Sequence, residues 1–316
     1  MKRLIFIAMF LISVLALFAE EVTVVLDWYP NTNHTGLYVA KDLGFYREEG
    51  LDVKIVQPSR LTAEQLVASG KAEFGVSYQE AVTLSRGEGM PIVSIAAIIQ
   101  HNTSGFAWLK DEGIKSVKDW EGKRYGSWGS PIEKATIEYI MRKYGADPSK
   151  VIFVNVGQMD FFAGTLNDVF DFAWIFYGWD GVASKVKGIE IEFLPLKDID
   201  EVFDYYTPVL ITSESLMKQK PDLVRRFLRA TAKGYEYAIQ HPVEAAKILL
   251  KYAPELDEKI VVESQKYLAG QYKADAEKWG YQKEEVWRRY AEWLHSMGFL
   301  KEMIDVTKAF TNEFLP

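Results

Sequence analysis

Residues 24–56, VVLDWYPNTNHTGLYVAKDLGFYREEGLDVKIV, contain the pattern that decides the fold. Residues 22–28 are mostly apolar and predict a strand, and residues 35–43 have a helical period that ends at Gly44. Residues 52–57 predict a second strand. A strand, a helix and a strand in this order form a βαβ unit, which favours a sheet of mainly parallel strands.

The same alternation continues along the chain in two successive series. Further strands are expected over residues 74–78, 92–99, 123–128, 151–156, 172–177 and 189–194, and helices over residues 61–68, 79–86, 130–144, 161–166 and 181–186. The remainder is mostly helical, over residues 221–240, from Pro242, and over residues 260–268 and 284–297. This order predicts an α/β protein of two lobes with a ligand cleft between them, at the carboxyl ends of the strands.

The composition excludes several classes of function. The chain has 316 residues, of which 48% are apolar and 26% charged, and a net charge of -7, so no basic face for nucleic acid is expected. It has no cysteine, which excludes disulfides, thiolate metal sites and cysteine nucleophiles. The four histidines lack the spacing of a metal site. We therefore expect no metal, no cofactor and no catalytic residues.

The first residues resemble a secretory signal peptide. Lys2 and Arg3 precede an apolar run over residues 4–18, and Ala19 stands before Glu20 at a candidate cleavage site. The alternative is an uncleaved membrane anchor, although the run is short for a membrane span. A signal peptide over residues 1–19 predicts a protein that works in the periplasm or outside the cell.

Aromatic and polar side chains gather where the predicted strands end. The candidate ligand-binding residues at these positions are Trp28, Asn31, His34, Tyr78, Glu80, Trp128, Tyr177 and Asp180. Rings beside hydrogen-bonding groups suit a flat, polar heterocycle, because the rings can stack on it and the polar groups can match its donors and acceptors.

Each of these residues also has a structural interpretation. A single tryptophan or tyrosine can be a core residue, and His34 can cap or orient the first helix. Asp27 is expected to brace its loop by accepting backbone N–H groups, since a bare buried carboxylate is costly. Ser130 and Pro131 are expected at the N-cap and first position of a helix.

Three stretches resemble a known family. LDWYPNTNHTGLYVAKDLGFYREEGLDVKIV, GSWGSPIEKATIEYIM and DFAWIFYGWDGVASK are similar to the pyrimidine-precursor binding proteins of bacterial thiamine-salvage transporters. That family also contains the yeast thiamine-pyrimidine synthases. The resemblance covers about residues 22–216.

The resemblance implies a type II periplasmic-binding-protein fold. Lobe 1 would comprise residues 20–101 and 207–316 and lobe 2 residues 102–206, with hinges at residues 101–103 and 205–207. It further implies a monomer that binds hydroxymethylpyrimidine or formylaminopyrimidine and delivers it to the permease of an ABC transporter. Trp28 and Asn31 would lie in the cleft with Tyr177 and Asp180 opposite; Asp180 would contact the ligand directly or through a water.

Two other functions remain open at this stage. Riboflavin, or another small heterocycle, is the alternative ligand, because similar folds bind it. A thiamine-pyrimidine synthase is the alternative of a different class. The synthases carry a cysteine-rich iron site. This chain has no cysteine and has a predicted signal peptide, and both features argue against a synthase.

Overall fold

The computed structural model describes residues 19–57, 60–157 and 159–316. The predicted signal peptide lies outside these residues, except for Ala19. Within the described part of the chain, no helix is both long enough and apolar enough to cross a membrane.

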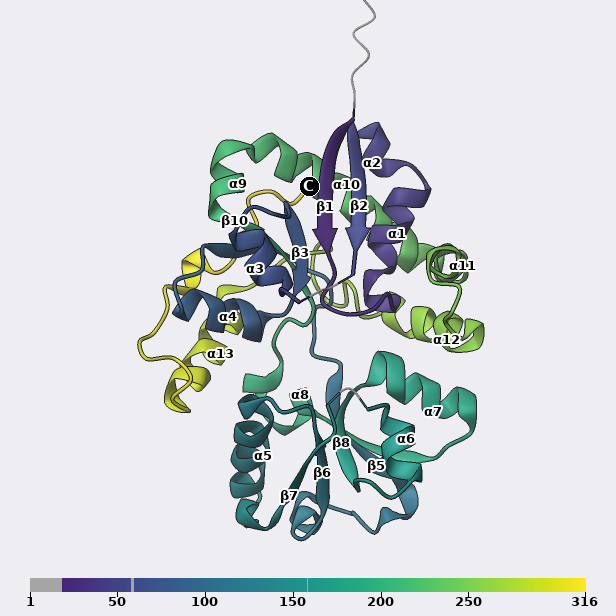
Figure 1. Cartoon of the computed structure of the whole chain (residues 1–316), viewed down its shortest axis with the longest axis vertical. Helices are drawn as coiled ribbons and strands as arrows, with labels where there is room; N and C mark the ends of the chain where they lie inside the picture. Colours follow the sequence, from purple (N-terminus) through teal and green to yellow (C-terminus); the bar gives the residue numbers. More distant parts are fainter. Residues whose placement is uncertain (1–18, 58–59, 158) are drawn as a thin grey trace, which may run out of the picture.

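A first sheet of five strands forms the upper lobe in Figure 1. Its order is β2-β1-β3-β10-β4, with β1 parallel to β2 and β3, and β10 antiparallel to β3 and β4. The strands are β1 (Glu20–Val25), β2 (Leu51–Val56), β3 (Phe74–Ser77), β4 (Ile92–Ala97) and β10 (Val209–Ser213). Successive side chains of β1 enter different cores, since Val24 packs in one and Val25 in the other. The sheet is therefore buried on both faces.

Helices cover both faces of this first sheet. They are α1 (Thr35–Asp42), α2 (Phe45–Glu48), α3 (Ala63–Ala68), α4 (Gln79–Gly87), α9 (Glu214–Gln219), α10 (Pro221–Gln240), α11 (Pro242–Tyr252), α12 (Glu258–Ala269) and α13 (Glu284–Ser296). The longest, α10, buries Leu223, Phe227 and Tyr235 at the predicted helical spacing. It crosses α1 closely, because a Cβ on Gly234 would lie 2.1 Å from the carbonyl oxygen of Gly36.

A second sheet of five strands repeats the plan in the lower lobe. Its order is β7-β6-β8-β5-β9, with β6 parallel to β7 and β8, and β5 antiparallel to β8 and β9. The strands are β5 (Ser104–Leu109), β6 (Arg124–Ser127), β7 (Ile152–Asn155), β8 (Phe172–Phe176) and β9 (Ile191–Pro195), and the helices are α5 (Pro131–Lys143), α6 (Phe161–Leu166), α7 (Val182–Lys187) and α8 (Leu196–Ile199). The predicted two-lobed α/β architecture is confirmed.

The chain crosses between the lobes twice, from β4 to β5 and from β9 to β10. The strand made directly after each crossing, β5 or β10, is the antiparallel strand of its sheet. The two crossings run side by side: the N–H of Ile98 donates to the carbonyl of Pro208 at 3.0 Å. His101 bridges them further, with Nδ1 2.7 Å from Asp204 and Nε2 2.9 Å from Asp275.

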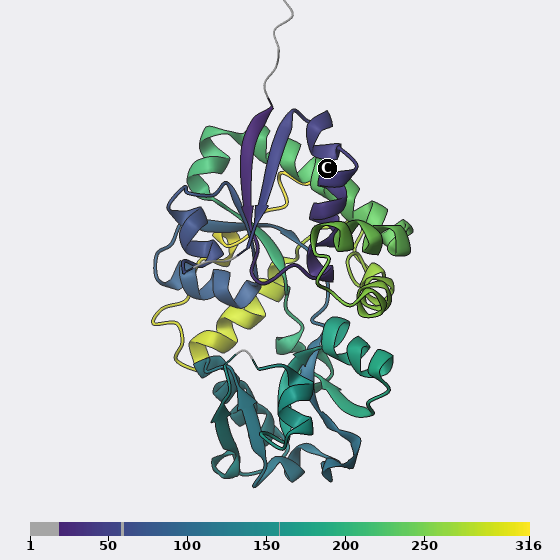
Figure 2. The ribbon, with the colours of Figure 1, turned by 45° about the vertical axis from the view of Figure 1, so that its right-hand side comes forward.

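The lobes also touch on either side of the crossings (Figures 1 and 2). On one side α12 packs on α7 and on the turn before it. On the other, Trp293 of α13 packs edge-on against Phe203 and Tyr139, with ring centroids 5.3 Å and 6.1 Å apart. One apolar core is consequently continuous from the first lobe into the second.

Candidate functional site

The loop after β1 exposes two rings to solvent and is held by hydrogen bonds between polar side chains behind them. Trp28 is 46% exposed and Tyr29 59% exposed. Behind them, Nε2 of the fully buried His34 lies 2.7 Å from the Asp27 carboxylate, and Nδ1 of His34 accepts the Asn31 backbone N–H at 3.2 Å. Since Nδ1 is an acceptor, Nε2 carries the proton and donates it to Asp27. Asp27 thus braces the loop through a side chain, not through the backbone N–H groups that we expected.

This geometry reassigns His34. Both ring nitrogens are occupied and the ring has no exposed surface, so His34 has no donor or acceptor left for a ligand. The prediction that His34 contacts a ligand is therefore wrong, and the ring positions the loop instead. Asn31 caps the short turn Thr32–His34: its Oδ1 accepts the Asn33 N–H at 2.8 Å and its Nδ2 donates to the Tyr29 carbonyl at 3.0 Å. One N–H of its amide remains available.

The loop after β6 presents a third ring on a different frame. Trp128 is 45% exposed and meets Trp174 edge-on, with ring centroids 5.5 Å apart. Beneath the loop, Glu133 is fully buried and accepts five hydrogen bonds. The donors are the hydroxyls of Tyr125 (2.7 Å) and Ser127 (3.0 Å) and the backbone N–H groups of Trp128 (3.2 Å), Gly129 (3.1 Å) and Ser130 (2.9 Å). Ser130 and Pro131 occupy the predicted N-cap and first position of α5.

The residues after β3 lie close to those after β1. Tyr78 is partly exposed, and burial raises the pKa of Tyr78 above its usual value, as do the nearby carboxylates of Glu80, Glu64 and Asp27. Glu80 accepts the Tyr290 hydroxyl at 3.2 Å. Burial, opposed by the hydrogen bond from Tyr290 and aided by the Glu133 carboxyl of the second lobe, raises the pKa of Glu80 to about 7. The carboxyls of Glu80 and Glu133 therefore lie within electrostatic range of each other across the lobes.

The turn after β8 is a π-helical turn, Tyr177–Gly181, of a kind frequent at functional sites. Burial, and then the neighbouring Asp160, raise the pKa of Asp180 to about 7. The Tyr177 ring packs between Phe193 and Tyr267, with centroids 4.9 Å and 5.2 Å away. Among the described residues, no hydrogen bond or ring contact joins Tyr177 or Asp180 to Trp28, Tyr78 or Glu80.

Three residues that support the site were not predicted. Glu133 holds the Trp128 loop, Tyr290 bonds Glu80, and the Ser264 hydroxyl bonds both the Gly178 carbonyl and, at 2.6 Å, the Thr32 hydroxyl. Only Glu133 had a local signal, because a serine N-cap followed three residues later by glutamate is a capping box. Tyr290 and Ser264 come from helices distant in sequence.

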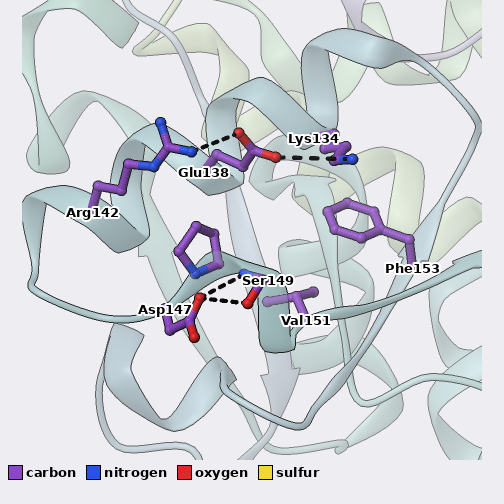
Figure 3. Close-up of a pocket in the computed structure, with 8 residues that line it drawn as sticks. Lys134, Glu138, Arg142, Asp147, Ser149, Val151 and Phe153 are labelled. Carbon is purple, nitrogen blue, oxygen red and sulfur yellow. Dashed lines mark hydrogen bonds and ion pairs between the residues drawn. The ribbon is translucent and has the colours of Figure 1, made fainter.

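A pocket of about 470 Å³ lies elsewhere, at the α5 and β7 edge of the second lobe (Figure 3). Glu138 is paired there with Arg142 at 3.3 Å and with Lys134 at 3.9 Å, and Asp147 accepts two hydrogen bonds from Ser149. None of the eight predicted residues lines it. Its charged groups already have partners, and no exposed ring of the strand ends lines it, so it is not a candidate for the predicted heterocycle.

Over residues 19–57, 60–157 and 159–316, no three histidine, aspartate or glutamate side chains are grouped as metal ligands. Glu80 and Asp180, the two carboxyls whose pKa is raised to about 7, belong to opposite lobes. The groups available to a ligand are therefore rings, carboxyls, an amide and hydroxyls.

The fold defines the class of protein. The periplasmic aliphatic sulphonate binding protein SsuA from Escherichia coli superposes with a TM-score of 0.70 over 92% of this chain and 91% of its own, at 12% identity. The chain has the periplasmic-binding-protein fold, as the sequence predicted. Residues 31–245 match the family described as NMT1/THI5 like, and the chain belongs to this family.

Proteins that are similar to this chain in sequence have different activities. The formylaminopyrimidine-binding protein of Halalkalibacterium halodurans is 30% identical over 93% of this chain and 90% of its own length. The 4-amino-5-hydroxymethyl-2-methylpyrimidine phosphate synthase of Legionella pneumophila is 27% identical over 94% and 93%. The riboflavin-binding protein RibY of Chloroflexus aurantiacus is 28% identical over 94% and 86%.

Proposed function

We propose that the protein is a receptor for an aminopyrimidine precursor of thiamine, either hydroxymethylpyrimidine or formylaminopyrimidine. The observation that carries this proposal is the pair of half-exposed tryptophans, Trp28 and Trp128, one on each lobe. A flat heterocycle between the lobes could stack on these rings and bury their exposed apolar surface. Carboxyls, an amide and a tyrosine hydroxyl stand beside these rings to match a polar ring edge.

The receptor would close on its ligand. Lobe 1 would comprise residues 20–101 and 207–316 and lobe 2 residues 102–206, with the two crossings as hinges. Trp28, Asn31, Tyr78 and Glu80 would meet the ligand from the first lobe, and Trp128, Tyr177 and Asp180 from the second. Closure around a ligand is a common motion of such two-lobed proteins. The closed form of this monomer would be recognised by the permease of an ABC importer, outside the cytoplasm and after removal of residues 1–19.

Two observations support a receptor over a synthase. The relative with the highest identity reported above is a binding protein. The chain also has no cysteine for an iron site of the kind that the synthases carry. Riboflavin remains the second candidate ligand, because a riboflavin-binding relative is nearly as similar.

Calorimetric titration of the chain from Glu20 onward would test the proposal. Hydroxymethylpyrimidine, formylaminopyrimidine, thiamine and riboflavin would each be titrated into the protein. We expect one of the two pyrimidines to bind tightest, with one site per chain. Tighter binding of riboflavin would contradict the ligand assignment. Formation of a pyrimidine product with iron and pyridoxal phosphate would contradict the receptor class.

A further inference from the structure

We propose that Glu80 recognises the ring nitrogen and the adjacent amino group of the ligand together, and that the bound pair shares one proton. The inference rests on the proposed function, because it takes the ligand to be an aminopyrimidine. It assigns a specificity-determining role to one carboxyl among the several at the strand ends.

Glu80 is placed to have one oxygen free for a ligand. It lies in the first turn of α4, two residues after the partly exposed Tyr78 that caps this helix. Its Oε2 accepts the Tyr290 hydroxyl at 3.2 Å, which is a long hydrogen bond. In the part of the chain that the structure describes, no hydrogen bond reaches Oε1 and no lysine, arginine or histidine pairs with this carboxyl.

The groups that face Glu80 offer it no positive charge. Tyr78 precedes it on its own helix, Tyr205 approaches from the second crossing, and Tyr290 from α13. Burial raises the pKa of each of these tyrosines above its usual value, so all three are neutral at neutral pH. The remaining group is the Glu133 carboxyl of α5 in the opposite lobe. A second negative charge at this place would be poorly compensated.

An aminopyrimidine can bind Glu80 without leaving an uncompensated negative charge. Its ring nitrogen accepts a hydrogen bond, and the amino group next to it donates one. A protonated carboxyl offers the complementary pair, with its O–H donating to the ring nitrogen and its carbonyl accepting from the amino group. If the proton moves to the ring nitrogen, the same two hydrogen bonds join a carboxylate and a cation. Either way the pair holds one proton and has no net charge.

The proton makes binding depend on pH. Since burial raises the pKa of Glu80 to about 7, the carboxyl already holds this proton in acid solution. Above that pH the free protein has lost it, so a proton must be taken up with each ligand. The dissociation constant should then rise about tenfold for each further pH unit.

Titrating hydroxymethylpyrimidine at pH 6–9 tests the inference. The calorimetric heat, measured in buffers of different ionisation enthalpy, gives the protons taken up, and the pKa of the free ligand is measured separately. At pH 9 we expect Glu80 to take up one proton for each ligand bound. Near pH 6 we expect no uptake by the protein, because Glu80 is already protonated. Glu80→Gln keeps a donor and an acceptor without the titration, so it should bind at pH 6 within a few fold of the wild type. At pH 9 it should bind more tightly than the wild type.

Two further variants separate this role from a structural one. Tyr290→Phe removes the hydrogen bond that lowers the pKa of Glu80. The pH at which the dissociation constant begins to rise should therefore move upward. Glu64→Gln, at a buried carboxyl bonded to Ser77, should leave the pH profile unchanged. Urea unfolding would confirm that each variant is folded.

The outcomes are distinguishable. Binding of the pyrimidine at pH 9 with no proton uptake, or a Glu80→Gln variant with the wild-type pH slope, would overturn the role of Glu80 alone. Tighter binding at higher pH would also overturn it. If no pyrimidine binds at any pH, the proposed function and this inference both fail.

Discussion

The two tryptophan loops present nearly the same surface but are held in different ways. Trp28 and Trp128 are about equally exposed. The first loop is held by a relay from Asp27 through the buried His34 to the Asn31 backbone, which uses two hydrogen bonds. The second is held by one buried carboxyl, Glu133, that collects five. The second loop therefore depends far more on a single side chain.

Glu133→Ala should produce the largest effect. It leaves two hydroxyls and the backbone N–H groups of Trp128 and Ser130 without their acceptor, while the Gly129 N–H keeps the Ser127 hydroxyl at 2.9 Å. We expect a loss of about 3–5 kcal/mol in the free energy of unfolding, measured by urea denaturation. Glu133→Gln keeps the volume and one acceptor oxygen, so it should lose less. A loss below about 1 kcal/mol for the alanine variant would show that the loop does not depend on this carboxyl.

His34→Ala should destabilise the first loop by a smaller amount. The substitution leaves a cavity and removes the partners of Asp27 and of the Asn31 N–H. We expect about 2–3 kcal/mol of lost stability in thermal or urea unfolding. Asp27→Asn is the matched control, because its amide oxygen can still accept the proton of Nε2. Equal losses in both variants would mean that the relay matters through the Asp27 charge and not through its geometry.

Trp28→Ala and Trp128→Ala should weaken ligand binding without unfolding the protein. Each ring offers stacking and apolar burial, for which we expect about 1–2 kcal/mol of lost binding free energy by calorimetry. Because both rings are about half exposed without ligand, the loss of stability should stay below about 1 kcal/mol. An affinity that is unchanged in a destabilised Trp28→Ala protein would make this ring part of the core.

His101 also has carboxylate partners, as His34 does, and here the effect should be smallest. The hydrogen bond that the His101 ring donates to Asp204 is the main cause that raises the pKa of His101 to about 9, with Asp275 adding to it. The folded pKa lies above the unfolded value of about 6.5, so the stabilisation is complete below about pH 6.5 and is lost as the pH rises through about 9. Because the ring is 38% exposed, we expect no more than about 1 kcal/mol.

The check is a comparison of the wild type with His101→Gln in urea at pH 6 and at pH 10. The two proteins should differ at pH 6 and nearly agree at pH 10. A difference that grows with pH would contradict the assignment of a charged His101 at the crossings.

Local patterns were enough to predict most of the fold. The strand at β8 and the helices α1, α5 and α10 lie where residues 172–177, 35–43, 130–144 and 221–240 indicated, within one or two residues at each end. The strands β5 and β10 were missed. Both are fully or almost fully buried, and neither is part of a βαβ unit, so the alternation that revealed the others was absent. The β-branched run before the Ser213 helix cap was the available signal for β10.

The sequence predicted those parts of the site whose residues lie close together along the chain. The tryptophans were predicted because they follow strands. Asp27 was predicted to brace its loop because a bare buried carboxylate is costly. The partner was His34, seven residues away, and not the backbone. Tyr290 stands 210 residues from Glu80, and Ser264 stands 232 residues from Thr32. Contacts over such separations are set by the packing of α12 and α13, which no local pattern encodes.

The adjacency of the two crossings makes the second lobe a removable cassette. The chain leaves the first lobe after Ile98 and returns at Pro208, and these residues are hydrogen bonded at 3.0 Å. A gene lacking the codons for residues 99–207 would still encode all five strands of the first sheet, with ends near enough for a short glycine linker. Polar substitutions would be needed where Phe203 and Tyr139 now cover Trp293. The same junction would accept a fluorescent domain in place of the lobe.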